Sequence, residues 1–174
     1  NAYTSNDETY YYEFFPSNKL ELGLWLESER MLHPVIDEVG VQTQNEVVKE
    51  EKRLSYDNRP YGQLLPQITQ SLFKKHPYRW LPIGSMDHLD SATLDEFIAY
   101  NKKFYVPNNA VLVVAGNFEI DETKNKIKDY FGPIPRGNDV PRIDIEEDPL
   151  TAEVRKSFYD PNIQLPMGLV CYRI

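Results

Sequence analysis

The stretch from Gln44 to Leu54 constrains the fold most, because it lacks proline and glycine and has the apolar spacing of a helix. One face of this helix carries three apolar residues, Val47, Val48 and Leu54. Glu51 lies on the same face, between them. A carboxylate among apolar side chains is costly to desolvate unless a metal, a cation or several donors bind it. Two interpretations follow: Glu51 reaches water at the edge of the helix, or it binds a cation.

Composition excludes several classes of function. The chain has 174 residues, 41% of them hydrophobic and 26% charged, as expected for a globular domain. Acidic residues outnumber basic residues by 27 to 19, and the net charge of −8 argues against a nucleic-acid partner. No apolar run is long enough to predict a membrane span. The single cysteine, Cys171, excludes an internal disulfide and a cysteine-based zinc site.

Local patterns predict both strands and helices. Two strands are predicted, Thr9–Phe15 and the apolar run Ala110–Ala115, the second buried on both faces. Helices are predicted over Asn18–Leu32, from between Asp37 and Val41 to about Tyr56, over Gln63–Lys75, over Ala92–Phe104 with Asp90 or Ser91 as its cap, and from a cap at Asp121 to Phe131. The helix over Asn18–Leu32 is apolar nearly all round, which predicts burial on more than one side.

The region after Gly137 differs in composition. Residues 138–150 combine prolines with an acidic cluster, which is typical of a linker; the cluster is Asp144, Glu146, Glu147 and Asp148. Two strand-like segments follow, Ala152–Tyr159 and Gln164–Tyr172. They need a sheet to join, and too little sequence follows to build one.

The three histidines, His33, His76 and His88, do not form a metal-binding pattern. None is four residues from another, and none has metal-ligand spacing to a carboxylate on the same helix. We expect His33 to end a helix, where a cation is favoured, and the other two to act as turn or capping residues in loops. The residues alone therefore indicate one unusual carboxylate and no complete catalytic site.

The order of short motifs along the chain is more specific than any one of them. The motifs are Asn1-Ala-Tyr-Thr-Ser5, Pro16-Ser-Asn18, Leu24–Met31, Asn45–Arg53, Arg59-Pro-Tyr-Gly62, Ile83–Leu89, Tyr105–Ala110, the strand Val111–Ala115 and Gly116-Asn-Phe118. This ordered set resembles the pitrilysin and insulinase family of zinc peptidases, the inverzincins. The resemblance extends from Asn1 to about Arg136, and more loosely to Ile174.

The resemblance implies an α+β fold, a mainly antiparallel sheet with helices packed on one side. This is a half-domain of the metalloenzyme LuxS/peptidase-like type. Residues 1–137 would form the C-terminal part of an inverzincin peptidase domain, 138–150 the linker, and 151–174 the first strands of the following domain.

The resemblance also assigns roles to residues. In the family, a helix with the motif His-x-x-Glu-His supplies two zinc ligands and the general base, and a glutamate on a later helix completes the metal shell. Glu51 matches that glutamate. The chain contains no His-x-x-Glu-His, which the family places upstream of the segment matching Asn1, so no catalytic residue is predicted within it. Gln44 stands where many relatives carry an acidic residue seven positions before the ligand, which leaves the supporting carboxylate unassigned.

Asn1, Ala2 and Tyr3 match an edge strand against which relatives bind their substrate as an added β-strand. The alternative is an ordinary start of a strand. The implied parent is a zinc-dependent metalloendopeptidase, with zinc as cofactor and a peptide as substrate. Its partners would be the remaining peptidase domains or a homologous subunit, in the bacterial periplasm or cell envelope.

Two other functions compete with this one. The first is a non-catalytic partner domain of a two-chain inverzincin peptidase. Such domains usually lose the ligand glutamate, so the presence of Glu51 favours the enzyme. The second is a peptide-binding module unrelated to proteolysis, resting on the aromatic strand Thr9–Phe15 alone. By itself, the chain is predicted to be inactive.

Overall fold

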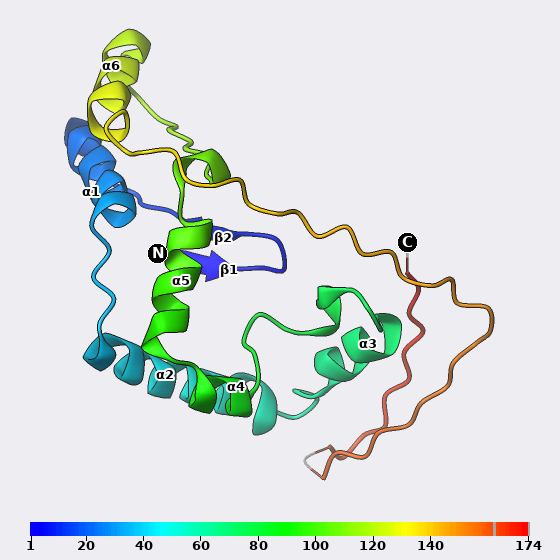
Figure 1. Cartoon of the computed structure of the whole chain (residues 1–174). Helices are drawn as coiled ribbons and strands as arrows, with labels where there is room; N and C mark the ends of the chain where they lie inside the picture. The colour runs from blue at the N-terminus through cyan, green and yellow to red at the C-terminus, as the bar shows by residue number, and fades with distance from the viewer. Residues whose placement is uncertain (162, 174) are drawn as a thin grey trace. The chain divides into compact units, whose positions relative to one another are not determined.

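The computed structural model describes residues 1–161 and 163–173 (Figure 1). Its strands and α-helices are β1 (Ala2–Thr4), β2 (Thr9–Tyr11), α1 (Leu20–Leu32), α2 (Glu38–Lys52), α3 (Leu64–Leu72), α4 (Met86–Ser91), α5 (Leu94–Phe104) and α6 (Ile120–Phe131). Shorter helical turns are η1 (Ser17–Lys19), η2 (Arg53–Asp57), η3 (Pro77–Arg79) and η4 (Pro107–Asn109). The chain forms two compact units. The first contains Asn1–Tyr3, Thr9–Val41 and Ala92–Arg142, and the second contains Thr4–Glu8, Gln42–Ser91 and Ile143–Ile174.

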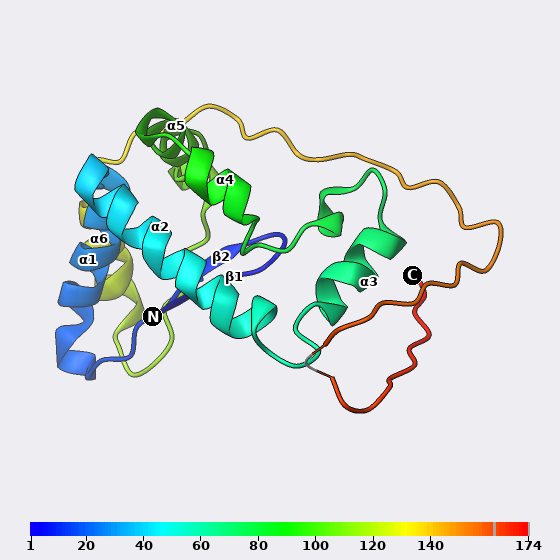
Figure 2. The ribbon, with the colours of Figure 1, turned by 90° about the horizontal axis from the view of Figure 1, so that it is seen from below.

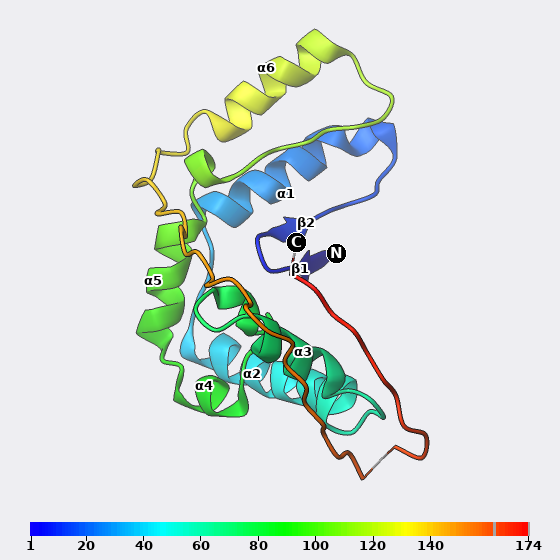
Figure 3. The same ribbon diagram turned by 90° about the vertical axis from the view of Figure 1, so that its right-hand side faces the viewer.

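In the first unit, α1 and α6 lie side by side (Figures 1 and 3). Leu24 and Ser28, one turn apart on α1, are 3% and 2% exposed and mark its packed side. Glu21 links the two helices, since it accepts a hydrogen bond from the Tyr130 hydroxyl at 2.9 Å. The opposite side of α1 carries Leu22, which is half exposed. The helix is therefore buried on one side. Its composition predicts burial on more than one side, and that prediction is wrong.

The strands β1 and β2 form an antiparallel hairpin. Asn1 and Tyr12 exchange backbone hydrogen bonds of 3.0 and 2.9 Å, and the Ser5 amide donates to the Glu8 carbonyl at 2.8 Å. This register places Ala2 opposite Tyr11. The strand predicted over Thr9–Phe15 is thus confirmed over its first three residues, Thr9–Tyr11.

Tyr11 anchors the hairpin on the first unit. Its hydroxyl shares a 2.8 Å hydrogen bond with the hydroxyl of Tyr105, and the guanidinium of Arg30 lies 4.5 Å from its ring centre. Burial, together with the bond to Tyr105, raises the pKa of Tyr11 to about 12. The hydroxyl therefore stays neutral at physiological pH, and the hydrogen bond persists.

The mainly antiparallel sheet implied by the resemblance is not present in the part of the chain that the structure describes, which is helix-rich and has one two-stranded sheet. The predicted buried strand at 110–115 is extended but solvent-exposed, with Val111 90% exposed. No strand is assigned to the described residues of 152–159 or 164–172. The reason is physical: a strand needs a neighbour for its backbone N–H and C=O groups, and no described strand lies beside these segments.

The predicted helices are confirmed to within a few residues, but two predicted caps are wrong. The cap of α5 is Thr93, whose hydroxyl accepts from the Glu96 amide at 3.4 Å while the Glu96 carboxylate accepts from the Thr93 amide at 2.8 Å. Ser91 belongs to α4 instead. In α6, Asp121 lies in the first turn, where its charge is favourable, and does not cap the helix.

Candidate functional site

The helix α2 packs through one side that carries polar residues. The Asn45 side-chain amide donates to the carbonyl of Leu89 at 3.1 Å, and the Lys49 ammonium pairs with Asp90 at 2.6 Å. The ribbons of α2 and α4, which carry these residues, are labelled in Figure 2. These contacts hold the end of α4 against α2. Hydrogen bonds to Asp90 and then to Glu46 raise the pKa of Lys49, which keeps it charged.

Glu51 lies on nearly the opposite side of α2 from Asn45 and Lys49, because successive helical residues rotate by about 100°. Val47 and Leu54 share that side and are 54% and 63% exposed. Glu51 is exposed as well, and so is Glu50. The predicted inward orientation of Glu51 is therefore wrong for this chain. The apolar positions were taken to mark the packed side, whereas the polar contacts of Asn45 and Lys49 determine it.

The other charged side chains between Glu46 and Arg53 are all in ion pairs. These pairs are Glu46–Lys49 at 2.7 Å, Glu50–Arg53 at 3.1 Å and Lys52–Asp57 at 2.9 Å. Glu51 differs from them, since its carboxylate has no hydrogen bond or ion pair with any residue in 1–161 or 163–173. Its charge is therefore available to an external ligand.

The turn that follows α2 has a geometry that its sequence requires. The turn η2 is wider than an α-helix, and its Asp57 accepts a 2.9 Å hydrogen bond from the Gln63 side chain. Tyr61 adopts a left-handed conformation with φ of 61°, which is uncommon for a residue with a side chain. A Cβ atom at Gly62 would collide with the carbonyl oxygen of Tyr56. Backbone geometry thus explains Gly62 of the motif Arg59-Pro-Tyr-Gly62 but not Tyr61.

The histidines act mainly in local structure. His76 caps η3 by accepting a 3.2 Å hydrogen bond from the Tyr78 amide, which confirms its predicted capping role. His33 ends α1, as predicted, but its Nδ1 lies 2.8 Å from a carboxylate oxygen of Glu29, four residues earlier on the same helix. The expectation that no histidine is spaced to meet a carboxylate on its own helix is therefore wrong for His33. His88 lies within α4 and not in a loop, which corrects its predicted place.

We tested whether the residues present fit a zinc ion. Among the described residues, no group of three or more His, Cys, Asp or Glu side chains is placed to hold a metal. Glu51 is an exposed carboxylate without a partner in the described chain, and one carboxylate alone does not make a metal shell.

The edge strand β1 has the geometry for adding a further strand. Because Asn1 exchanges hydrogen bonds with Tyr12, the N–H and C=O of the next residue, Ala2, point away from β2. Tyr3 lies on the other face of the strand from Ala2, and its ring stacks on that of Tyr10 with centroids 5.3 Å apart. The row of rings continues through Tyr12 and Phe14 at centroid separations of 5.9 and 5.7 Å. Of the three predicted residues, Asn1 pairs with Tyr12, Ala2 presents its main-chain N–H and C=O away from β2, and Tyr3 adds a half-exposed ring to the aromatic row.

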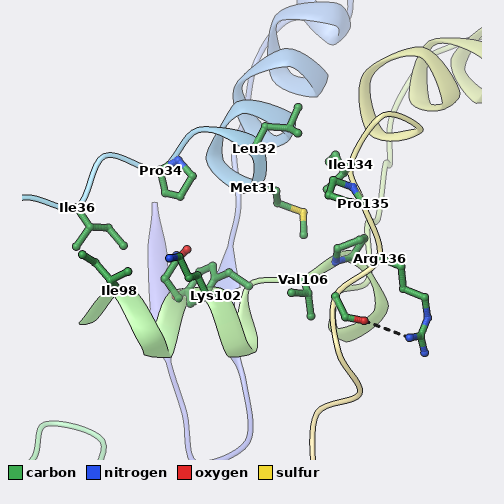
Figure 4. A pocket seen from close by; sticks show the side chains of 14 residues that line it. Met31, Leu32, Pro34, Ile36, Ile98, Lys102, Val106, Ile134, Pro135 and Arg136 are labelled. Carbon is green, nitrogen blue, oxygen red and sulfur yellow. Dashed lines mark hydrogen bonds between the residues drawn. The ribbon is translucent and has the colours of Figure 1, made fainter. Parts of the chain in front are cut away.

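The first unit also contains an apolar cavity of about 580 Å³ (Figure 4). It lies between the end of α1, the end of α5 and the segment after α6. Its lining comprises Met31, Leu32, Pro34, Ile36, Ile98, Asn101, Lys102, Tyr105, Val106, Pro107, Ile134, Pro135, Arg136 and Gly137. None of the predicted site residues lines it, and its two charged residues have no acid–base partner among the others.

Comparison with known proteins now decides the family. Residues 91–172 match the family model described as the Peptidase M16 inactive domain. The zinc protease PqqE of Helicobacter pylori is 32% identical over 131 residues, which are 75% of this chain and 30% of that protein. The crystal structure of a protease from Helicobacter pylori matches with a TM-score of 0.76 at 30% identity, covering 83% of this chain and 35% of the other. The chain belongs to the pitrilysin-like M16 peptidase family.

This pitrilysin-family chain is much shorter than its relatives. It spans 30%, 29% and 33% of the lengths of three curated relatives, all named zinc proteases. In fold it is also similar to the first half of the periplasmic protease PqqL from Escherichia coli, with a TM-score of 0.70 at 24% identity over 83% of this chain and 31% of the other. Both structural neighbours are described as proteases, and this helix-rich chain covers 35% and 31% of their lengths.

The structure brings together one set of residues in this pitrilysin-family chain that the sequence did not single out. Glu147, from the predicted linker, reaches the backbone of residues 74–76. The four acidic residues of that linker look equivalent in sequence. A signal that separates Glu147 from Glu146 would have to come from its partner loop, which lies about 70 residues earlier in the chain.

Proposed function

We propose that this chain is part of a zinc-dependent metalloendopeptidase that hydrolyses peptides, and that Glu51 is one of its zinc ligands. The observation that carries the proposal is the exposed Glu51 carboxylate, which has no partner among residues 1–161 and 163–173, on the uncovered apolar side of α2. Relatives named zinc proteases support it. The motif His-x-x-Glu-His would come from another part of the protein, as in the inverzincins.

The residues around Glu51 suit a ligand position. The neighbouring cations Lys49, Lys52 and Arg53 are held in ion pairs with other carboxylates, so none of them neutralises Glu51. Val47 and Leu54 flank it with apolar surface that a neighbouring element would cover, excluding water from the ligand. When bound, zinc supplies Lewis-acid activation of a peptide carbonyl and of water.

We propose the domain organisation from the same resemblance: residues 1–137 as the C-terminal part of a peptidase domain, 138–150 as linker and 151–174 as the first strands of the next domain. Exposed apolar residues in the last segment support this, since Val154, Leu165 and Val170 are 60%, 71% and 79% exposed. The partners would be the remaining peptidase domains or a homologous subunit. The neighbour described as a first half of PqqL fits an enzyme built from paired halves.

The compartment we propose is the bacterial periplasm or cell envelope. PqqL, whose first half resembles this chain in fold, is a periplasmic protease. Within residues 1–161 and 163–173, no helix is both long and apolar enough to cross a bilayer.

We propose further that Asn1, Ala2 and Tyr3 bind the peptide substrate as an added β-strand. The main chain of Ala2 would exchange hydrogen bonds with the peptide, because its N–H and C=O face the open edge of β1. Tyr3 would place its half-exposed ring against a substrate side chain. Because neighbouring residues of β1 differ in the direction of their main-chain groups, Ala2 would bind the main chain of the peptide and Tyr3 would contact one of its side chains.

Replacing Ala2 by proline tests this edge. Proline lacks the outward N–H, whereas the hydrogen bonds from Asn1 to β2 are kept. In a version of the protein that includes His-x-x-Glu-His, we expect KM for a peptide to rise about tenfold, the value of one hydrogen bond. Ala2→Val retains the N–H and should leave KM unchanged. Equal KM values in both variants would contradict substrate binding at this edge.

The proposed function is tested by comparing two lengths of the protein. We expect the chain of 174 residues alone to lose zinc on dialysis and to show no peptidase activity, because Glu51 is a single ligand. The longer version with His-x-x-Glu-His should retain about one zinc per chain, measured by atomic emission, and cleave a fluorogenic peptide. Stoichiometric zinc or zinc-dependent cleavage in the short chain would overturn the assignment.

The second candidate function is a non-catalytic partner domain of a two-chain peptidase. One observation favours it: the family model that matches residues 91–172 is described as an inactive domain. The residues encoded immediately before Asn1 decide between the two. A His-x-x-Glu-His there supports the enzyme, and a degenerate motif supports the partner domain.

A further inference from the structure

The carboxylate of Glu147 is bound by three consecutive backbone amides. Its Oε1 atom accepts hydrogen bonds from the N–H groups of Lys74, Lys75 and His76 at 2.7, 2.5 and 2.6 Å. Its Oε2 atom lies 3.3 Å from the guanidinium of Arg173. The Glu147 and Arg173 side chains are 12% and 16% exposed, so the contact is largely shielded from water. The extended segment that contains Glu147 is drawn in orange in Figure 3.

The loop that provides these amides is held in place by its own contacts. The ring of His76 lies against that of Tyr78 with centroids 4.2 Å apart, and the Tyr78 ring packs edge-on against Phe73 at 5.7 Å. The Arg79 guanidinium donates to the Lys74 carbonyl at 2.9 Å. None of these contacts involves Glu147. The loop is therefore braced by contacts other than those to Glu147, and its three N–H groups form a nest for an anion.

Neighbouring residues reinforce the docked segment. Lys75 pairs with the Asp148 carboxylate at 2.7 Å, and Arg173 donates to the Asp148 carbonyl at 2.6 Å. Glu146 shows the contrast, since it is exposed and makes no hydrogen bond or ion pair with the described residues. The contacts thus select one register of the acidic cluster, with Glu147 in the nest and Asp148 beside it.

We propose that the loop Phe73–Tyr78 is a carboxylate-binding site whose ligand is Glu147 of the same chain. The docked Glu147, with Asp148 and Arg173, forms a latch that fixes the segment after Arg142 on the second unit. The segment is then not a free linker but a docked part of this unit. The inference does not depend on zinc or on peptidase activity.

The latch should respond to acid. Burial raises the pKa of Glu147, but the hydrogen bonds from His76, Lys75 and Lys74 and the charge of Arg173 outweigh it, so the pKa lies below the ordinary value of 4.5. A carboxyl group with a lowered pKa contributes stability above its unfolded pKa and loses it as pH falls through the folded pKa. The titratable groups that face it are Lys75, His76, Asp148 and Arg173. We therefore expect an intact latch at neutral pH and its release only as the pH falls below 4.5.

Amide exchange in the chain of 174 residues tests the latch. In the wild type, the amides of residues 74–76 should exchange slowly. In Glu147→Ala, their exchange should accelerate by about tenfold or more, because three hydrogen bonds to a charged acceptor are lost. Glu147→Gln, which keeps the shape but not the charge, should fall between the two. The matched control, Glu146→Gln, should exchange like the wild type.

A second measurement guards against a folding defect in Glu147→Ala. A zero-length carbodiimide cross-link should join Lys75 to Asp148 in the wild type and in Glu146→Gln, because their charged atoms lie 2.7 Å apart. The link should be depleted in Glu147→Ala and in Glu147→Gln. If the exchange rates and the cross-link yield are the same in the wild type and both Glu147 variants, the latch is overturned.

Discussion

Glu51→Gln should abolish zinc retention and peptidase activity in a version of the protein that includes His-x-x-Glu-His. The amide has almost the shape of the carboxylate but no charge to offer the metal, so we expect zinc affinity to fall by about 100-fold or more. The fold should be kept, because Glu51 is exposed and makes no hydrogen bond or ion pair within the described chain. Zinc content after dialysis, cleavage of a fluorogenic peptide and the melting temperature measure the three effects.

The neighbouring residue provides the control. Glu50→Gln changes the same chemical group on the same helix, and its ion pair with Arg53 at 3.1 Å is exposed to solvent. Such pairs contribute little, so the free energy of unfolding should change by less than about 0.5 kcal/mol, and activity should be unchanged. Equal loss of activity in both variants, or no loss in either, would remove Glu51 from the metal shell.

The helices were predictable because their signals are local. The spacing of apolar residues and the absence of proline located α2, and the turn residues Asp57–Gly62 ended it. Strands depend on distant partners. The run at 110–115 has the composition of a buried strand, yet Val111 is exposed, because no described strand pairs with it. The composition of this segment indicates a tendency to form a strand, but it does not indicate which strand would pair with it.

The orientation of α2 was less accessible to sequence reasoning. Val47 and Leu54 suggested the packed side, but the side that packs carries Asn45 and Lys49, which bond to the carbonyl of Leu89 and to Asp90. Pairing with residues about 40 positions away cannot be inferred from the periodicity of one helix. The apolar side with Val47 and Leu54 and the packed polar side with Asn45 and Lys49 are both explained if the Val47 side faces another part of the peptidase. The zinc-ligand proposal is based on this arrangement.

The contact of Glu147 with residues 74–76 was also not predictable from the sequence. The acidic residues around Glu147 predicted a solvated linker, and for Glu146 the structure agrees. The nest that selects Glu147 is made of backbone N–H groups, which carry no signature in side-chain sequence. The sequence around His76 predicts a turn or capping residue, but nothing in it indicates that the neighbouring amides bind a carboxylate.

Leu24→Ala should be the most destabilising single truncation in the first unit. Leu24 is 3% exposed on the side of α1 that carries the buried Ser28, and α1 packs against α6. Removing its side-chain methyl groups leaves a cavity that the two helices fill only partly, so we expect the free energy of unfolding to fall by about 3 kcal/mol.

Leu22→Ala is the matched control for this change, because it removes the same atoms two residues earlier on the same helix. Leu22 is 49% exposed, so the expected loss is under about 1 kcal/mol, and helix propensity changes equally in both variants. Urea unfolding followed by fluorescence measures both, with Trp25 on α1 as a local probe. A loss from Leu22→Ala as large as that from Leu24→Ala would mean that α1 packs through a different side than the structure shows. A different packed side of α1 would also change how the hairpin is held. Arg30 on α1 contacts the ring of Tyr11 in β2, the strand that pairs with Ala2.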